Sequence, residues 1–174
     1  MNYTFIILGI IVAVLIYVLY LYFSDDSTKL FEYEDLSKSG KIIGSGDLHT
    51  SGNYAYGFWI YINNYSGGKT LLQRGPNANP SLKVYLPGST PTLKVDIETT
   101  TTETINVTNN FPIQKWVHVV VSKDVQVVDV YIDGKLVKSH MLEASSIDHE
   151  GDLTSEPFEA FMARLKTWKH GLNP

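Results

Sequence analysis

The sequence predicts an all-β fold, an antiparallel sandwich or jelly roll, preceded by a single N-terminal transmembrane helix. Two observations lead to this prediction. An apolar run without any charged residue extends from Phe5 to Phe23. Beyond about residue 40, apolar and polar residues alternate in short segments that recur roughly every ten residues with turn residues between them, a spacing typical of antiparallel sandwiches.

The apolar run is long enough to cross a bilayer. At about 1.5 Å per residue it measures close to the ~30 Å of a hydrocarbon core. No Lys or Arg precedes it and bulky aromatic residues end it, so the marks of a cleaved signal peptide are missing. We therefore expect an uncleaved single-pass anchor. Its apolar side chains are Phe5, Ile6, Ile7, Leu8, Ile10, Ile11, Val12, Val14, Leu15, Ile16, Val18, Leu19, Leu21 and Phe23.

Tyrosines flank this anchor at both ends. Tyrosine rings favour the headgroup level of a bilayer, so we expect an interfacial belt. Its members are Tyr3, Tyr17, Tyr20 and Tyr22. The expected organisation is a tail over 1–4, the transmembrane helix over 5–23, a linker and lead-in over 24–39, and the sandwich over 40–174. The lysines that follow the helix favour the cytoplasmic side for the sandwich.

Composition and charge exclude several classes of protein. The chain has no cysteine, which excludes disulfides, thiolate catalysis and cysteine-based zinc sites. Its 14 Lys and Arg against 18 Asp and Glu give a net charge of −4 without a basic stripe, so we expect no nucleic-acid partner. The expected partners are a lipid bilayer and other proteins.

Individual strands can be assigned from the alternation. Residues Tyr54 to Ile62 are apolar on both faces, which predicts a central strand covered on both sides. Leu93 to Glu98 alternates strictly and predicts a half-buried strand with one wet face. Further strands are expected over 82–86, 116–121 and 125–132. Asp133-Gly134 then joins two apolar runs, which favours a two-residue type I′ hairpin.

The ordered series YAYGFWIYI, TLLQRG, PIQKWVHVVVS and VDVYIDGKLVKS resembles the laminin-G/pentraxin type of concanavalin A-like domain, over roughly residues 40–170. The resemblance implies that Trp116 fills the core between the sheets and that Asp133-Gly134 reverses the chain. The residues that carry the fold signature are Phe58, Trp59, Trp116, Tyr131, Asp133 and Gly134.

The segment from Phe158 to Leu172 gives two conflicting signals. Phe158, Phe161, Met162, Leu165 and Trp168 have the spacing of an amphipathic helix. The same segment is similar to the closing strand of the family, with Ala160 in place of the usual glycine. We favour the strand because the sandwich requires that element.

A narrower resemblance concerns the whole architecture. A short anchor followed directly by this domain looks like membrane-anchored minor capsid proteins of large DNA viruses of algae and protists. Such viruses enclose a membrane beneath an icosahedral shell, so the resemblance implies a location in a virion, between capsid and inner membrane.

Three groups of residues were considered for chemistry, and none predicts a catalytic, metal or cofactor site. Asp96 and Glu98 share a strand face, but their order and the position of Glu103 do not fit a glucanase, and a solvated face is favoured. His118 lies between valines, which is typical of a structural histidine. The oxygen-rich stretch 148–152 lacks EF-hand spacing and is expected to be a solvated loop, although pentraxin-like domains can bind calcium.

We therefore expect a non-catalytic, membrane-anchored structural or interaction protein, with a minor capsid protein that links a viral shell to the underlying membrane as the favoured role. The alternative is a membrane-displayed, lectin-like module that binds glycans, with or without calcium. In that case Tyr61, Tyr65 and Tyr85 are candidates for stacking on sugars. A glycoside hydrolase is the third and least favoured hypothesis.

Overall fold

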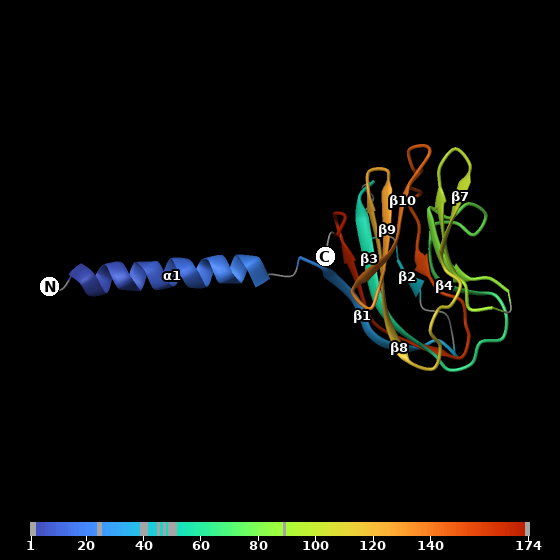
Figure 1. Ribbon diagram of the computed structural model, residues 1–174, viewed down its shortest axis with the longest axis horizontal. Coiled ribbons are helices and arrows are strands. Elements are labelled where there is room, and N and C mark those ends of the chain that lie inside the picture. The colour runs from blue at the N-terminus through green and yellow to red at the C-terminus, as the bar shows by residue number, and fades with distance from the viewer. Residues whose placement is uncertain are drawn as a thin grey trace.

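The computed structural model describes residues 3–23, 26–38, 42–44, 46, 48, 52–88 and 90–172. Within these residues the chain forms one helix and two layers of β-strands, and Figure 1 shows the helix standing apart from the layers. The prediction of an antiparallel, all-β sandwich is confirmed, because every strand pair is antiparallel.

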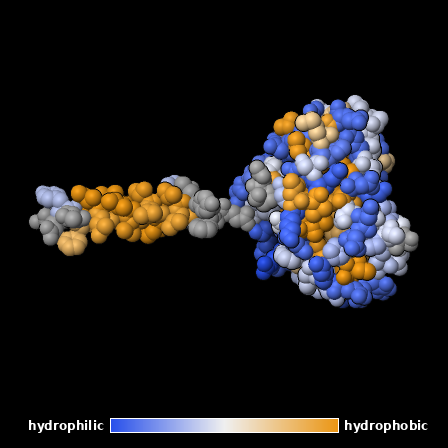
Figure 2. All heavy atoms as spheres, in the orientation of Figure 1, coloured by the Kyte–Doolittle hydropathy of each residue, from blue (hydrophilic) through white to orange (hydrophobic). Residues whose placement is uncertain are grey.

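Helix α1 (Tyr3–Phe23) is apolar on all sides and its described side chains are exposed, as Figure 2 shows. Phe5 is 70% exposed, and Tyr3, Tyr17 and Tyr20 of the expected belt are also exposed. The side chains of Leu21, Tyr22 and Phe23 lie outside the described residues. The stretch of α1 with fully described side chains is 5–20, and over the described residues no helix reaches the length and hydropathy that crossing a membrane requires.

The strands form two sheets of six within the described residues. Sheet A has the order β1 (Thr28–Asp35), β12 (Ala160–Trp168), β3 (Tyr54–Ile62), β8 (Trp116–Asp124), β9 (Val127–Ile132) and β10 (Lys135–Met141). Sheet B has the order β2 (Ile42–Ile43), β11 (Leu153–Thr154), β4 (Lys69–Arg74), β5 (Leu82–Leu86), β6 (Leu93–Glu98) and β7 (Thr102–Thr108).

The core lies between the two sheets, where alternate residues of each strand point inward. On β3 the inward residues include Tyr54, Phe58 and Ile60, each at most 1% exposed. Leu82 and Val95 face them from sheet B and are fully buried. Burial of each such aliphatic or aromatic side chain contributes about 1.5–3 kcal/mol, which makes this two-sided core the main source of stability.

Strand β3 is central, between β12 and β8, and both of its faces are covered as predicted over its first half, where Ala55 and Gly57 are buried, but not at Trp59 and Tyr61. Trp59 and Tyr61, the outward residues of its second half, are half-buried, because over them the described chain places no second layer. Their apolar character therefore reflects an aromatic surface instead of a second core.

The Asp133-Gly134 hairpin is confirmed. Both residues have positive φ, 50° and 74°, as a type I′ turn requires. At the other end of β9 the structure differs from the prediction, because Val125 belongs to the β8–β9 turn, with φ of 53°, and the strand starts at Val127.

The C-terminal segment forms strand β12, as the family resemblance implied. A β-bulge explains its helical spacing. The pairing of β12 with β3 shifts between Ala163 and Lys166, and Arg164 has a φ of 51°. The extra residue changes the phase of the alternation, so that Met162 and Leu165 both face the core three positions apart.

Strand β1 lies in the segment 24–39 that was expected to be linker and lead-in. It pairs with β12 and forms an edge of sheet A, where Leu30 and Phe31 pack partly against the core. Its other residues are largely charged, which is typical of edge strands and hides them from an alternation search.

Candidate functional site

Aromatic side chains from four neighbouring strands meet on the outer face of sheet A. We call this group the aromatic face; it consists of Tyr33 (β1), Phe161 (β12), Trp59 and Tyr61 (β3) and Trp116 (β8). These residues share a face because they occupy the positions between the inward core residues of their strands. Register brings them together, since Tyr61 lies opposite both Phe161 and Trp116.

The rings form a continuous row across the strands. Tyr33 stacks on Phe161 with centroids 5.9 Å apart and planes 18° from parallel. Tyr61 continues the row, 6.4 Å from Phe161 and 5.8 Å from Trp116, with tilted planes. Tyr33 and Trp116 at the two ends are 55% and 41% exposed, so flat ring surfaces are open to a partner.

A hollow of about 160 Å³ opens in this face, lined by Trp59, Trp116, Ala163 and Arg164. Ala163 lies opposite both Tyr33 and Trp59 in the strand register, so a small side chain separates larger ones there. The result is a concave apolar floor with one guanidinium at its edge. At about 160 Å³ the hollow is smaller than the roughly 300–1,000 Å³ of pockets that enclose a whole small ligand, so it can contact only part of one.

Arg164 reaches the hollow from the bulge of β12. Non-glycine residues with positive φ are uncommon and carry backbone strain, which often marks a functional position. The Arg164 Nε atom lies 3.5 Å from Glu32 Oε1, and Lys29 Nζ lies 2.9 Å from Glu32 Oε2. All three side chains are mostly exposed, so these ion pairs are weak and a ligand can displace them.

His118 adds a polar ring beside the aromatic face. It stacks on Trp59 with centroids 4.9 Å apart, and its backbone N–H donates to Asp133 Oδ1 at 2.9 Å. Burial lowers the pKa of His118, with Asp133 opposing and Lys166 reinforcing the shift. The imidazole is therefore neutral near pH 7 and offers both a donor and an acceptor.

A second hollow, of about 530 Å³, lies on sheet B, and its described lining is almost entirely polar. The Glu156 carboxylate accepts the backbone N–H of Thr70 at 2.7 Å, and Gln73 donates to Asn77 at 2.8 Å. Its lining residues are Thr70, Gln73, Asn77, Lys83, Thr154, Ser155, Glu156 and Pro157. It lacks the flat rings that distinguish the aromatic face.

Asp96 and Glu98 point to different partners. The Tyr85 hydroxyl donates to Asp96 Oδ1 at 3.2 Å. Glu98, whose side chain is 12% exposed, lies 2.9 Å from His149 Nε2. Asp96 keeps the half-exposed position predicted for it, whereas the prediction of a solvated Glu98 is wrong because the 147–149 segment covers it.

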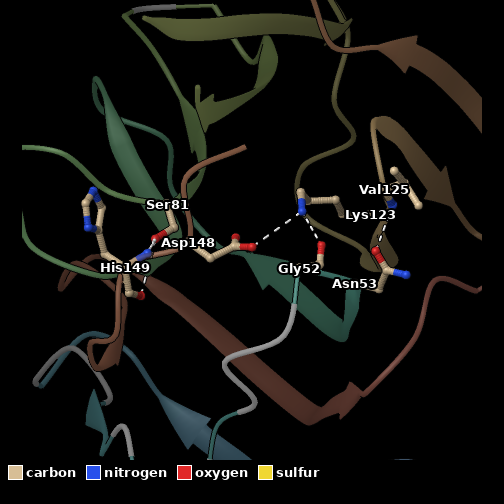
Figure 3. A network of polar contacts seen from close by, with 7 residues as sticks. All are labelled: Gly52, Asn53, Ser81, Lys123, Val125, Asp148 and His149. Atoms are coloured by element: carbon tan, nitrogen blue, oxygen red, sulfur yellow. Dashed lines mark hydrogen bonds and ion pairs between the residues drawn. The ribbon is translucent and has the colours of Figure 1, made fainter. Parts of the chain in front are cut away.

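The oxygen-rich loop 148–152 is not simply solvated, which corrects the prediction. Figure 3 shows Asp148 directed at Lys123, and the two side chains, 12% and 1% exposed, are 3.6 Å apart. The Lys123 ammonium also donates to the Gly52 carbonyl, and burial lowers its pKa against the opposing effect of Asp148. Asp148 thus neutralises a buried cation. Among the described residues no three His, Asp or Glu side chains are grouped to hold a metal ion.

The fold-signature residues have diverse positions. Phe58 is in the core, Tyr131 is buried on the outer side of sheet A, and Asp133 and Gly134 form the hairpin turn. Trp116 does not fill the core, contrary to the expectation. Val117 and Val119 take the inward positions of β8, so the alternation turns Trp116 outward.

Of the three tyrosines expected to stack on sugars, only Tyr61 belongs to the aromatic face. The Tyr65 hydroxyl donates to the Gly88 carbonyl at 2.6 Å, and the Tyr85 ring lies beneath the Lys83 ammonium. The sequence analysis missed Tyr33, Phe161 and Arg164 as site residues. These residues occupy outward-facing positions of β1 and β12. The sequence alone does not show that the two strands are neighbours, so it does not bring these side chains together.

Comparisons with solved structures find a similar fold in several proteins. Domain 4 of AbnA, an extracellular GH43 arabinanase from Geobacillus stearothermophilus solved with arabinotriose, matches with a TM-score of 0.64 and 13% identity, over 86% of this chain and 96% of that one. The binding domain of botulinum neurotoxin serotype C1 matches with a TM-score of 0.65 and 14% identity, over 84% and 44%. A Bacteroides ovatus protein named for a proposed carbohydrate-binding role matches with a TM-score of 0.60 and 13% identity, over 86% and 45%.

The chain spans nearly all of the arabinanase domain but less than half of the other two. Among curated proteins the search finds no match. The family model described as the concanavalin A-like lectin/glucanases superfamily, Laminin_G_3, matches residues 37–172. That range contains both sheets apart from edge strand β1, and the chain therefore belongs to this superfamily.

Proposed function

We propose that this protein is a non-catalytic glycan-binding module and that the aromatic face of sheet A is its binding surface. The observation that carries the proposal is the hollow between Trp59 and Trp116 with Arg164 at its edge. The faces of sugar rings are made largely of C–H groups, which pack on flat aromatic rings, while hydroxyls need polar partners around them. Arg164 and the neutral His118 supply such partners.

The comparisons support the same conclusion. One similar structure was solved with arabinotriose, and another, of botulinum neurotoxin type C, is described as dependent on two ganglioside molecules for cell entry. The engagement of Asp96 by Tyr85 and of Glu98 by His149 supports a binding role over hydrolysis, because neither carboxylate is directed at a shared substrate position.

The membrane role belongs to the same proposal. Each described apolar side chain of α1 is exposed, and the uncharged run extends from Phe5 to Phe23. An exposed apolar surface on all sides of a helix favours burial in lipid. We infer that α1 inserts into a bilayer and displays the sandwich at its surface. The narrower role of a minor capsid protein in a virion rests on sequence resemblance alone and stays a prediction.

The glycan proposal is tested by substitution within the aromatic face. The full chain in detergent is screened on a glycan array, and the affinity of the best ligand is measured by calorimetry. We expect Trp116→Ala to weaken binding roughly tenfold or more, which corresponds to about 1.4 kcal/mol, because a stacking surface is lost.

Tyr85→Ala is the matched control, since it removes an aromatic ring from the outer face of sheet B and should leave the affinity unchanged. If Tyr85→Ala weakens binding and Trp116→Ala does not, the glycan site lies on sheet B. If the array shows no glycan ligand at all and the aromatic face instead captures a protein partner, the proposal of a glycan-binding module is wrong.

A further inference from the structure

The β8–β9 turn presents a strained, exposed apolar residue. Val125 has a φ of 53° and is 67% exposed. Branched side chains disfavour the left-handed region, where glycine or asparagine is usual. The Asn53 side-chain carbonyl accepts the Val125 N–H at 2.8 Å and fixes the turn, as Figure 3 shows. Since two thirds of its surface is exposed, Val125 is available for an apolar contact outside the described chain.

Met141 lies beside this turn. It ends β10, faces Val127 in the register and is 69% exposed. The next residue, Leu142, donates its N–H to the Gln126 carbonyl at 2.7 Å, which ties the end of β10 to the turn. Val125 and Met141 are therefore two apolar tips at the same end of sheet A.

A chain of contacts connects this end to the base of α1. The Asp26 carboxylate lies 2.7 Å from His170 Nε2. Gly171 follows directly and packs so closely on Asp124 that a Cβ added to the glycine would lie 2.7 Å from the Asp124 Cβ. Asp124 precedes Val125, so the turn lies a few contacts from Asp26.

Asp26 itself is the third residue after the end of α1. Three extended residues span at most about 10 Å. A bilayer that holds α1 therefore lies within reach of the end of the sandwich that carries Thr28, Trp168 and the Val125 turn. We call this the tether end.

We propose that the tether end docks on the bilayer, with the Val125 and Met141 side chains entering the interface between headgroups and acyl chains. This inference rests on the proposed insertion of α1. Transfer of two exposed apolar side chains out of water is favourable, and the short tether removes most of the entropy that such a contact would otherwise lose. The charged side chains nearby, Asp26, Asp124, Lys169 and His170, are of both signs, so a zwitterionic phosphatidylcholine surface is the partner.

Docking at this end has a consequence for the aromatic face. Strands of sheet A run from the tether end to the end that carries Tyr61, Trp116 and Phe161. Tyr61 and its partner Trp116 lie six positions beyond the pair of Ala55 and Ser122, which is about 20 Å along a strand. A docked sandwich therefore holds the end of the aromatic face with Tyr61 and Trp116 well away from the lipid surface.

The test uses the absence of cysteine from the chain, which allows a fluorescent label at single introduced cysteines. Val125→Cys, Leu136→Cys and Ile10→Cys each receive an environment-sensitive nitrobenzoxadiazole label, in the full chain reconstituted into phosphatidylcholine vesicles. Leu136 is the matched control, because it is 54% exposed on sheet A near the opposite end. Lipids with a spin label at the headgroup level or brominated in the acyl chain act as quenchers.

We expect the Ile10 label to be quenched by brominated lipid, the Val125 label by headgroup spin label, and the Leu136 label by neither. In a Val125→Asp background, a label at Met141→Cys should lose its headgroup quenching, because the turn can no longer enter the interface. If the Val125 label is quenched by neither lipid while the Ile10 label is quenched, the docking proposal is wrong and the insertion of α1 is supported. If Ile10 is not quenched, the anchor proposal fails and docking fails with it.

Discussion

At the scale of single residues, the burial of His118 makes the stability of the fold depend on pH. Its imidazole is stacked on Trp59, and burial lowers its pKa below the 6.5 of the free side chain. The unfolded chain therefore binds more protons than the folded chain as the pH falls through this range. The stability that His118 contributes is present above pH 6.5 and is lost as the pH falls toward the folded-state pKa.

We expect the free energy of unfolding of the wild type to decrease between about pH 7.5 and pH 5 by more than that of His118→Gln, because glutamine cannot take up the proton. Urea denaturation at the two pH values measures the difference. His170→Gln is the control with the opposite sign. Its neighbours Gly171 and Asp26 raise the pKa of His170, so its contribution is lost as the pH rises above 6.5. Parallel pH curves for the wild type and His118→Gln would refute this account of His118.

At the scale of elements, the bulge of β12 places a residue with a strained backbone, Arg164, in the candidate binding site. Arg164 has the positive φ that glycine tolerates best, yet a glycine there could not reach the hollow. The cost of the left-handed conformation is roughly 1–2 kcal/mol for a residue with a Cβ, whereas glycine loses roughly 0.5–1 kcal/mol of chain entropy within a strand. In a change of Arg164 to glycine these two effects largely offset each other. Such a variant therefore tests the role of Arg164 in binding with little change in stability.

We expect Arg164→Gly to leave the stability unchanged or to raise it by at most about 1.5 kcal/mol, and to weaken glycan binding. Thermal denaturation and calorimetry with the array-selected ligand give the two values. Arg164→Lys should bind with intermediate affinity, because it keeps the charge but not the planar guanidinium. An Arg164→Gly variant that binds normally would remove Arg164 from the site.

The strands show how far the sequence alone leads. Tyr54–Ile62, Leu82–Leu86 and Leu93–Glu98 were predicted with the bounds observed, the first because it is a continuous apolar run and the other two because they alternate without interruption. Strand β1 was missed because four of its eight residues are charged and its three apolar residues, Leu30, Phe31 and Tyr33, do not alternate regularly. The C-terminal segment looked helical because the bulge at Arg164 breaks the alternation, and a single sequence does not distinguish a shifted strand from a helix.

The site was harder to predict than the fold. Its aromatic residues come from strands adjacent in the order β1-β12-β3-β8, so residues more than 120 positions apart, such as Tyr33 and Phe161, stack on one another. Trp116 was expected in the core because the family resemblance implied that position. In the structure Val117 and Val119 face the core, so the alternation along the strand turns Trp116 outward.

At the scale of the whole molecule, the helix and the sandwich have separable roles. We expect the double substitution Ile11→Lys and Val14→Lys in the full chain to abolish flotation with phosphatidylcholine vesicles, because each lysine near the centre of a membrane helix costs roughly 2.5–3.5 kcal/mol. Glycan affinity should not change, since the aromatic face is formed by sheet A alone.

Leu136→Lys is the control for added charge, because this exposed position lies on the sandwich. It should float as the wild type does. A doubly substituted chain that still floats would show that α1 is not what holds the protein at the membrane.

The attachment of β1 determines how the protein responds to a pulling force. The tether enters at Thr28, the aromatic face lies toward the other end of the same sheet, and β1 pairs with β12 along its length. In a membrane-anchored, glycan-binding protein of the kind proposed, a glycan that is pulled away from the membrane loads this strand pair along the strand axis. Its hydrogen bonds share the load and must break together instead of one after another. If the protein works as proposed, its fold therefore resists a pull on a ligand held at the aromatic face.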